Sequence, residues 1–477
     1  MEPYLADDAP LYTDMYELTM AQGYFLEDMG DQTACFDYFF RSNPFDGGYV
    51  VFAGLSDLVE LLADFSFDDA ALDYLSQQGF DKAFVDHLEQ LEFGAELMAP
   101  PEGEIVFPFE PVIRVRGSII EAQIIETLLL NLINFSSLVA TKASRMRRVA
   151  GDRKLIDFGL RRAQGLGGLQ ASKAAVVGGF DSTSNVLAGF RTGIPIAGTQ
   201  AHSWIQSFAD ELSAFRAYAR RFPDRCILLV DTYDTLESGL PNAIKVAREL
   251  RDDGHELIGI RLDSGDLAYL AKKSREMLDD AGFPDVKIAA SNQLDEHVIK
   301  SLLQEQDAPI DVFGVGTQLV TAYDDAALDG VYKLCEVDGT PRIKISENFE
   351  KVNFPSAKKV LRLIDDQGMF YGDAVALDDE DRVDHIHHPY DPYKDVAVGD
   401  FEQQPLLEPV MRDGDIVADL HDIDEARSYA ATRLDALPAE HQRFNNPHIY
   451  KVGLSRRLHE LRHETLAAAK KSHDVGD

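Results

Sequence analysis

The chain has 477 residues, 45% of them hydrophobic, which is enough to bury a large core and favours two or three domains over one. Aspartate and glutamate total 82 against 46 lysines and arginines, so the formal net charge is −36. This charge repels nucleic acid and anionic lipid, and we therefore expect neither as a partner. The acidic residues are spread along the whole chain, which is typical of a solvated acidic surface.

The sequence predicts a reduced, cytoplasmic location. Its N-terminus has no basic start followed by an apolar run, the pattern of a secretory signal. The most apolar helical stretch, 119–138, is interrupted by polar side chains and is too polar to span a membrane. Cys35, Cys226 and Cys335 are far apart and show no CxxC spacing, so we expect neither a disulfide framework nor a zinc site.

One basic segment stands out against the acidic background. It contains Lys142, Arg145, Arg147, Arg148, Arg153, Lys154, Arg161 and Arg162, opposed by Asp152 and Asp157. Concentrated cations are costly unless an anion is bound, but a helix whose basic face pairs with acids elsewhere has the same pattern. Both interpretations are open for residues 145–153, whereas the pattern favours an anion site at Arg161 and Arg162.

From Lys154 onward the sequence repeats a short apolar run, a polar or glycine-rich cluster and a helical segment. The apolar runs are 155–156, 174–177, 194–197, 226–230, 257–260, 286–290, 310–313 and, as an eighth candidate, 331–335. Amphipathic helices are predicted at 241–251, 266–281 and 295–304. This alternation predicts a parallel sheet, and up to eight units predict an irregular β/α barrel with its polar clusters on the carboxyl-terminal rim.

The segments on both sides of the barrel have a β-rich pattern. Alternating runs precede it at 34–40, 104–109 and 112–115, and hairpins follow it at 359–376 and 409–417. We therefore predict an α/β protein in which the barrel, 118–345, lies between two parts of one sandwich domain, 1–117 and 346–477. Leu454, Leu458 and Leu461 have helical spacing and predict a helix that caps the second part.

The predicted rim suits a phosphorylated substrate. Its candidate ligand contacts are Phe158, Arg161, Ser184, Thr199, His202, Arg261, Asp263, Gly314, Gly316 and Thr317. Guanidinium groups pair with phosphate oxygens, and glycines near the end of a late barrel strand expose backbone N–H groups. Asp263 suits Mg²⁺ or ribose hydroxyls, whereas Asp266 suits a helix cap. His202 has three candidate roles, as phosphate ligand, general acid or phosphoryl acceptor.

Six motifs along the chain together resemble the nicotinate phosphoribosyltransferase family. They are YTDMYELTM (12–20), DFGLRRAQG (157–165), GGFDSTSNV (178–186), GTQAHS (198–203), LVDTYDT (229–235) and IRLDSGD (260–266). The resemblance runs in order from Tyr12 to about Arg457. It implies the second-type phosphoribosyltransferase fold, a barrel with a sandwich domain, and the substrates nicotinate, phosphoribosyl pyrophosphate and ATP, with Mg²⁺.

The resemblance also implies roles for single residues. Phe158 is expected to stack on the pyridine ring, and Arg161 and Arg261 to hold phosphate, pyrophosphate or the nicotinate carboxylate. His202 matches the family's phosphorylatable histidine and is expected to accept the γ-phosphoryl group of ATP. Asp14 and Tyr16 are expected to enter the active site of a neighbouring subunit, which implies a homodimer with composite sites.

Three other functions fit parts of the pattern. A nicotinamide phosphoribosyltransferase has an aspartate at the position of Ser184, and the serine here removes a carboxylate that would repel nicotinate. An isomerase or aldolase on a barrel needs a catalytic lysine or an acid and base pair on the rim, but Lys173 and Lys245 lie away from the predicted strand ends. A binding protein that has lost activity keeps the same pocket, and only an assay separates it.

Overall fold

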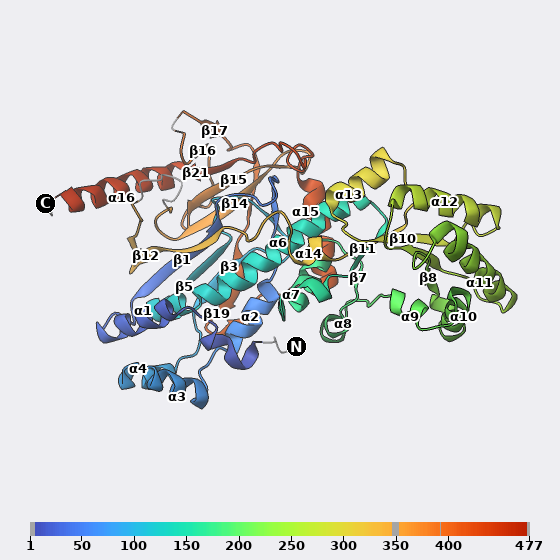
Figure 1. The fold of residues 1–477 in the computed structure, drawn as a ribbon. Coiled ribbons are helices and arrows are strands. Elements are labelled where there is room, and N and C mark those ends of the chain that lie inside the picture. Colours follow the sequence, from blue (N-terminus) through green and yellow to red (C-terminus); the bar gives the residue numbers. More distant parts are fainter. Residues whose placement is uncertain (1–4, 346–352, 392, 475–477) are drawn as a thin grey trace. The chain divides into compact units, whose positions relative to one another are not determined.

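The computed structural model of the protein describes residues 5–345, 353–391 and 393–474, and it divides into two compact units. The first unit contains both ends of the chain, Met1–Leu138 and Ala327–Asp477, and the second contains Val139–Ala326. The second unit is therefore inserted into the first along the sequence. Figure 1 colours the chain in this order, from blue through green and yellow to red.

The first unit is rich in antiparallel strands. Before the insertion it contains η1 (Ala6–Leu11), α1 (Met15–Leu26), β1 (Thr33–Phe40), β2 (Val50–Val51), α2 (Leu55–Ala63), α3 (Asp69–Gln77), α4 (Lys82–Leu88), β3 (Glu96–Ala99), β4 (Ile105–Val106), β5 (Ile113–Ser118), α5 (Ile119–Ile124) and the start of α6 (Glu126–Ala150). After it come β12 (Gly330–Val337), β13 (Thr340–Pro341), β14 (Lys358–Ile364), β15 (Phe370–Leu377), β16 (His385–His387), β17 (Asp395–Ala397), β18 (Glu402–Pro405), β19 (Glu408–Arg412), β20 (Asp415–Ile416), α15 (Ile423–Ala436), β21 (Val452–Ser455) and α16 (Arg456–Asp474).

These strands form a seven-stranded sheet, β13-β12-β1-β5-β3-β19-β20, a six-stranded sheet, β17-β16-β21-β15-β14-β18, and the small pair β2-β4. The predicted hairpins are confirmed, because β14 pairs with β15 and β19 pairs with β20. Gly368 in the first turn has φ 81°, a conformation that glycine adopts without steric cost. Strands from both ends of the sequence thus share one sheet, as β5-β3-β19 shows.

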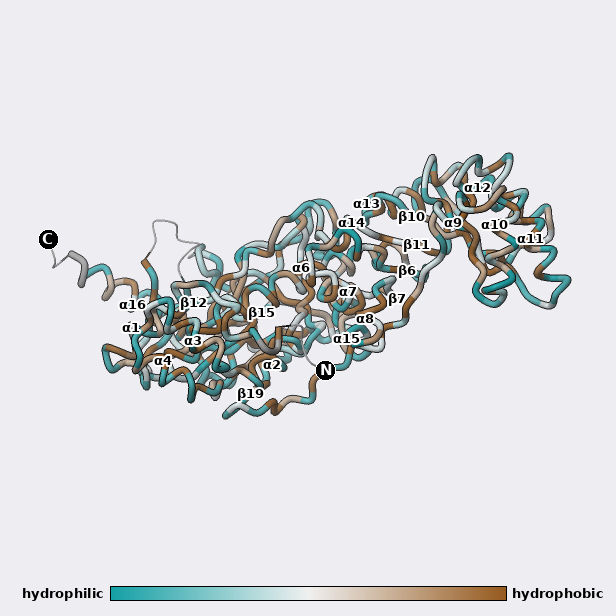
Figure 2. Tube along the Cα trace, turned by 60° about the horizontal axis from the view of Figure 1, so that its bottom comes forward, coloured by the Kyte–Doolittle hydropathy of each residue, from teal (hydrophilic) through white to brown (hydrophobic). Residues whose placement is uncertain are grey.

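The second unit contains a six-stranded parallel sheet in the order β7-β6-β11-β10-β9-β8. Its strands are β6 (Lys154–Asp157), β7 (Ser182–Thr183), β8 (Ile227–Leu229), β9 (Gly259–Leu262), β10 (Lys287–Ser291) and β11 (Val312–Val315). Its helices are η2 (Leu160–Arg162), α7 (Gly167–Val177), α8 (Val186–Thr192), α9 (His202–Gln206), α10 (Glu211–Arg221), η3 (Pro223–Arg225), η4 (Thr235–Gly239), α11 (Leu240–Asp252), α12 (Leu267–Asp280), α13 (Glu296–Lys300), η5 (Ser301–Glu305) and α14 (Thr317–Val320). Hydrophilic and hydrophobic residues alternate along α10, α11 and α12 in Figure 2, as expected of helices that bury one side.

Three predicted barrel strands need correction. Residues 174–177 belong to α7, which is buried on most sides, so that its apolar run has no helical periodicity to distinguish it from a strand. Residues 194–197 form only one bridge, between Ile196 and Thr183. Residues 331–335 lie in β12, which pairs with β1 in the antiparallel sheet of the first unit.

The compact units also differ from the predicted domain boundaries at 117/118 and 345/346. The first division falls at Leu138/Val139, within the continuous helix α6. The second falls at Ala326/Ala327, because β12 pairs with the first unit. Residue 346 itself lies outside the described residues. Within the described ranges, none of the helices combines the length and apolarity that crossing a membrane requires.

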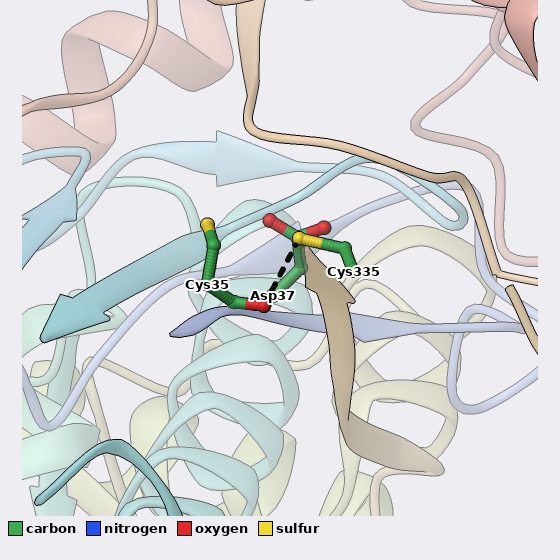
Figure 3. A group of neighbouring side chains, drawn as sticks. All are labelled: Cys35, Asp37 and Cys335. Carbon is green, nitrogen blue, oxygen red and sulfur yellow. Dashed lines mark hydrogen bonds between the residues drawn. The ribbon is translucent and has the colours of Figure 1, made fainter. Parts of the chain in front are cut away.

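Two of the cysteines that are distant in sequence lie close together in the first unit. Cys35 on β1 and Cys335 on β12 are buried with Asp37, and their ligand atoms lie within 4.8 Å of one another (Figure 3). The Cys335 thiol donates to the Cys35 carbonyl oxygen at 3.2 Å. The Lys358 ammonium group contacts Asp37 at 2.7 Å and is itself buried. This cation already neutralises the carboxylate, so the group is a core ion pair beside two thiols.

Candidate active site

The predicted rim residues of the second unit follow the carboxyl ends of its parallel strands. Phe158 follows β6, Ser184 follows β7, and Asp263 follows β9. In a parallel sheet these ends share one edge, where open α/β sheets bind ligands. Each strand is followed by a turn and then a helix, and the polar residues of the sequence lie in these turns, at the carboxyl edge of the sheet.

Arg261, on β9, joins three rim segments through its guanidinium group. It donates to the Ser291 hydroxyl at 2.9 Å, the Thr199 hydroxyl at 3.0 Å and the Asp263 carboxylate at 2.7 Å. Its side chain is 16% exposed. Its central carbon lies 5.2 Å from the centre of the Phe158 ring, within cation–π range. The structure thus brings three predicted site residues, Thr199, Asp263 and Phe158, together around one cation.

His202 lies beside Asp263 in the same cluster. Its Nε2 is 3.7 Å from the Asp263 carboxylate, and its Nδ1 is 3.0 Å from the Thr232 hydroxyl. Burial alone would raise the pKa of Asp263, but the Ser291 hydrogen bond and the charge of Arg261 outweigh it and hold the pKa below its ordinary value. Asp263 is therefore an anion throughout the neutral range. The imidazole is 39% exposed and accessible to a ligand.

Phe158 is fixed by the strands beneath it. Its backbone N–H donates to the Val315 carbonyl at 2.7 Å, and a Cβ added at Gly314 would come within 2.4 Å of its ring. Glycine at 314 is therefore required by packing, beyond any contact with phosphate. Gly316 caps the four-residue helix α14, and Thr317 at its start is exposed. These two remain predicted phosphate contacts.

Asp157, one residue before Phe158, anchors this part of the rim from below. Its carboxylate accepts hydrogen bonds from the Gly159 N–H at 2.8 Å, the Ser172 hydroxyl at 2.8 Å and the Thr183 hydroxyl at 2.7 Å. Burial raises its pKa, and these three donors oppose the rise. The Asp157 carbonyl also accepts the Ser184 N–H at 2.8 Å, which ties Ser184 to the strand that presents Phe158.

The basic segment separates into two groups. Lys142 and Arg145 form buried ion pairs with Glu296 at 3.0 and 2.8 Å, and Arg147 pairs with Asp181. These cations stabilise the fold, which confirms the alternative of a paired basic helix face. Arg161 and Arg162 differ, because both are exposed on η2 and neither guanidinium forms a hydrogen bond or ion pair with any described residue. They are available to an anionic ligand.

Asp14 and Tyr16 lie in the first unit, at the start of α1. Asp14 is the residue before the helix, and its backbone N–H donates to the Thr127 hydroxyl at 3.2 Å. Tyr16 is 47% exposed, so its ring is accessible. Glu17 beside it is fully buried, and burial raises the pKa of its carboxyl to about 7.

Asp231, Thr232 and Ser291 were not among the predicted site residues, and the structure shows that they organise the cluster. Asp231 accepts the Asp263 N–H at 2.8 Å and the Ser264 hydroxyl at 2.6 Å, while its other carboxylate oxygen is buried and accepts no hydrogen bond among the described residues. Thr232 orients His202, and Ser291 binds both Arg261 and Asp263. Asp266 caps α12 by accepting the Tyr269 N–H, as predicted.

The parallel sheet, the unpaired arginines beside it and the ordered carboxylates at its carboxyl edge define an α/β enzyme whose site suits an anionic, phosphate-bearing substrate. Comparisons with known proteins agree. Residues 11–134 match the nicotinate phosphoribosyltransferase N-terminal domain, residues 153–392 match the nicotinate phosphoribosyltransferase family, and residues 357–462 match its C-terminal domain.

Relatives match along almost the whole chain. The nicotinate phosphoribosyltransferase of Bacillus subtilis is 44% identical, with 96% of each chain covered, and that of Mycobacterium tuberculosis is 41% identical, with 98% of this chain and 96% of the relative covered. The crystal structure of human nicotinic acid phosphoribosyltransferase superposes with a TM-score of 0.84 at 34% identity, covering 95% of this chain and 99% of the human one. The chain belongs to the nicotinate phosphoribosyltransferase family.

Proposed function

We propose that this chain transfers the phosphoribosyl group of phosphoribosyl pyrophosphate to the ring nitrogen of nicotinate and releases pyrophosphate, a step of NAD biosynthesis, with hydrolysis of ATP. The observation that carries the proposal is the cluster in which Arg261 joins Thr199 and Asp263 beside Phe158 and His202. It offers a cation, an aromatic face and a nucleophilic imidazole at one strand edge.

Catalysis of phosphoribosyl transfer depends mainly on positioning the substrates and stabilising the charge that develops. When pyrophosphate leaves the anomeric carbon, positive charge develops on the ribose while the pyridine nitrogen approaches from the opposite face. Phe158 orients the pyridine ring, and the unpaired Arg161 neutralises an anionic group of the substrates. Asp263, held ionised by Arg261, faces the ribose or its phosphates.

In this proposal ATP acts by phosphorylating His202. When Nδ1–H donates to the Thr232 hydroxyl, Nε2 carries the lone pair, and this nitrogen attacks the γ-phosphorus of ATP while ADP leaves. The phosphoryl group adds charge and acceptor oxygens beside the phosphoribosyl site. Hydrolysis of this phosphohistidine then returns the free imidazole. The coupling raises substrate affinity, and each 1.4 kcal/mol so transferred is worth about tenfold.

Mg²⁺ fits the donors at this edge. Mg²⁺ binds one or two protein carboxylates together with substrate phosphates, and Asp231 has a buried oxygen that accepts no hydrogen bond from the described residues. Asp231 and Asp263 are the residues that would hold it. When bound, the ion neutralises charge on the departing pyrophosphate.

Two features of assembly belong to the same proposal. We infer that the sheet closes into an irregular barrel through residues 194–200, because Ile196 bridges to Thr183 at one sheet edge and the Gln200 side chain donates to the Ile227 carbonyl at the other. We also infer a homodimer with composite sites. Exposed apolar side chains, including Phe190 at 86% and Tyr16 at 47%, suit burial against a second copy.

The test compares nicotinate with nicotinamide, each with and without ATP. We expect a much higher kcat/KM for nicotinate, because Ser184 carries no charge to repel its carboxylate, and a lower KM for phosphoribosyl pyrophosphate when ATP is present. Equal efficiencies for the two substrates would instead favour a nicotinamide phosphoribosyltransferase.

A second measurement isolates the role of His202. Incubation with γ-labelled ATP should leave acid-labile, base-stable label on the wild type and none on His202→Ala. The variant should lose ATP hydrolysis yet keep slow phosphoribosyl transfer, because Arg261 and Phe158 remain in place. Equal labelling of both proteins removes His202 as phosphoryl acceptor.

A further inference from the structure

The C-terminal helix α16 carries the sequence His459-Glu460-Leu461-Arg462-His463. Residues four apart lie on the same side of a helix, and two histidines at this spacing are a recurrent metal-binding pair. In the structure the two Nε2 atoms are 3.3 Å apart. Two imidazole nitrogens on one tetrahedral zinc ion, each about 2.05 Å from the metal, lie about 3.3 Å apart. The observed separation matches that value, and it is also the length of a hydrogen bond between the two rings.

A third imidazole lies against His459 from the neighbouring sheet. His387 is the last residue of β16, and this strand contacts α16. Figure 1 labels both elements. Its ring stacks on His459 with centroids 5.0 Å apart and an angle of 26° between the planes. The His387 Nε2 is buried and has no hydrogen-bond partner among the described residues. A buried polar atom without a partner indicates a missing ligand or ion.

A carboxylate lies near the other nitrogen of His387, beyond hydrogen-bond distance. Its Nδ1 lies 4.0 Å from a carboxylate oxygen of Asp395. Histidines that bind metals direct their second ring nitrogen to a carboxylate or carbonyl, which sets the tautomer and leaves the first nitrogen free for the metal. Asp395 also contacts His385 Nδ1 at 3.2 Å, so it is held in place.

The arginine between the two histidines has contacts of its own. The Arg462 guanidinium is engaged elsewhere, since it donates to the Pro389 carbonyl and lies 5.2 Å from the centre of the Tyr390 ring.

We propose that His387, His459 and His463 bind a divalent metal ion of the zinc type, with a water molecule in the fourth position. The ring nitrogens of the three side chains do not all lie within 4.8 Å of one another in this structure, so binding requires side-chain rotations that bring the buried His387 Nε2 to the other two nitrogens. Three imidazoles suit Zn²⁺ and its neighbours in the transition series, and exclude Mg²⁺ and Ca²⁺, which prefer oxygen ligands. The bound ion links α16 to β16 and so fastens the C-terminal helix to the six-stranded sheet. We assign it no catalytic step, and it contains none of the residues proposed for phosphoribosyl transfer.

The other candidate cluster, Cys35, Asp37 and Cys335, is less suitable for a cation. Lys358 already pairs with Asp37 at 2.7 Å, and burial raises the pKa of the Cys335 thiol, which favours its protonated form. A metal there would have to displace a buried ammonium group and deprotonate a thiol. The histidine cluster needs neither change.

The experiment uses the full chain with any affinity tag removed and metals stripped by a chelator that is then dialysed away. Titration with ZnCl₂ in a calorimeter should show one site per chain, and Co²⁺ should give the visible absorption of a tetrahedral nitrogen site. His463→Ala, at an exposed position, and His387→Ala should each weaken Zn²⁺ binding at least tenfold. His255→Ala, which removes a partly exposed histidine from the second unit, is the matched control and should bind as the wild type does.

Stability provides the second measurement. Zn²⁺ should raise the melting temperature of the wild type and of His255→Ala but not of His463→Ala, because a ligand stabilises only the folded state that binds it. The kcat/KM of metal-free protein for phosphoribosyl transfer should not differ between wild type and His463→Ala. Unchanged Zn²⁺ affinity in His463→Ala or in His387→Ala, or the absence of stoichiometric binding to the wild type, would overturn the proposed three-histidine site.

Discussion

Replacing Arg261 by lysine tests whether its geometry, beyond its charge, organises the active site. The arginine donates from three nitrogens to Ser291, Thr199 and Asp263. An ammonium group keeps the charge but cannot span three acceptors on different rim segments, so we expect one of these bonds to survive. Hydrogen bonds to a charged group contribute about 1.5–3 kcal/mol each. The loss of two therefore costs at least about 3 kcal/mol.

If the transition state depends on this arrangement, about 3 kcal/mol corresponds to a loss of roughly a hundredfold in kcat/KM. The assay is steady-state turnover of nicotinate and phosphoribosyl pyrophosphate, with the melting temperature measured alongside to separate activity from folding. Arg248→Lys, at an exposed position on α11, is the matched control and should stay within twofold of the wild type. A kcat/KM for Arg261→Lys within threefold of the wild type refutes the reasoning.

Three further predictions follow from single residues. Ser184→Asp should raise the KM for nicotinate through like-charge repulsion, and an unchanged KM would show that Ser184 does not face the carboxylate. Mixing Tyr16→Ala with Arg161→Ala subunits should restore part of the activity if sites are composite, whereas verified heterodimers without activity would place each site within one chain. The Glu17 carboxyl has a pKa of about 7 in the fold against 4.5 unfolded, so ionising it destabilises the protein as pH rises from about 4.5 to 7. Glu17→Gln should flatten that part of the pH profile of the unfolding free energy, and an unaltered profile would contradict the assignment.

Short stretches of the sequence predicted the elements that depend on neighbouring residues alone, such as turns, helix caps and single strands. The hairpin between β14 and β15 follows from two apolar runs around a glycine turn, and Gly368 has the positive φ that such a turn needs. Helix α12 begins where Asp266 accepts a backbone N–H, as its position before an amphipathic run predicts. Five of the predicted parallel strands are present because each apolar run is followed by a turn and a helix.

Pairings between distant segments were not predictable in the same way. Residues 331–335 have the composition of a barrel strand, but β12 pairs with β1, almost three hundred positions earlier. The same pairing brings Cys335 beside Cys35. The prediction of a strand at residues 174–177 failed for a different reason. A helix that is buried on most sides has no polar face, so its sequence does not show the helical period. Within the site, Ser291 was missed as a functional residue because only the fold shows its contact with Arg261.

Contact with an acid distinguishes the structural cations of this protein from those available to a ligand. Lys142 and Arg145 lie on the same basic stretch of sequence as Arg161, yet both are buried against Glu296 and are fully used by the fold. Because the chain has a net charge of −36, acidic side chains are abundant. A lack of acids therefore does not explain a cation that is left unpaired at a strand edge. Arg161 and Arg162 are exposed and form no ion pair with the described residues. The proposed function assigns them an anionic group of the substrate as partner. Charge alone could not separate the two groups of cations, whereas their contacts in the fold do.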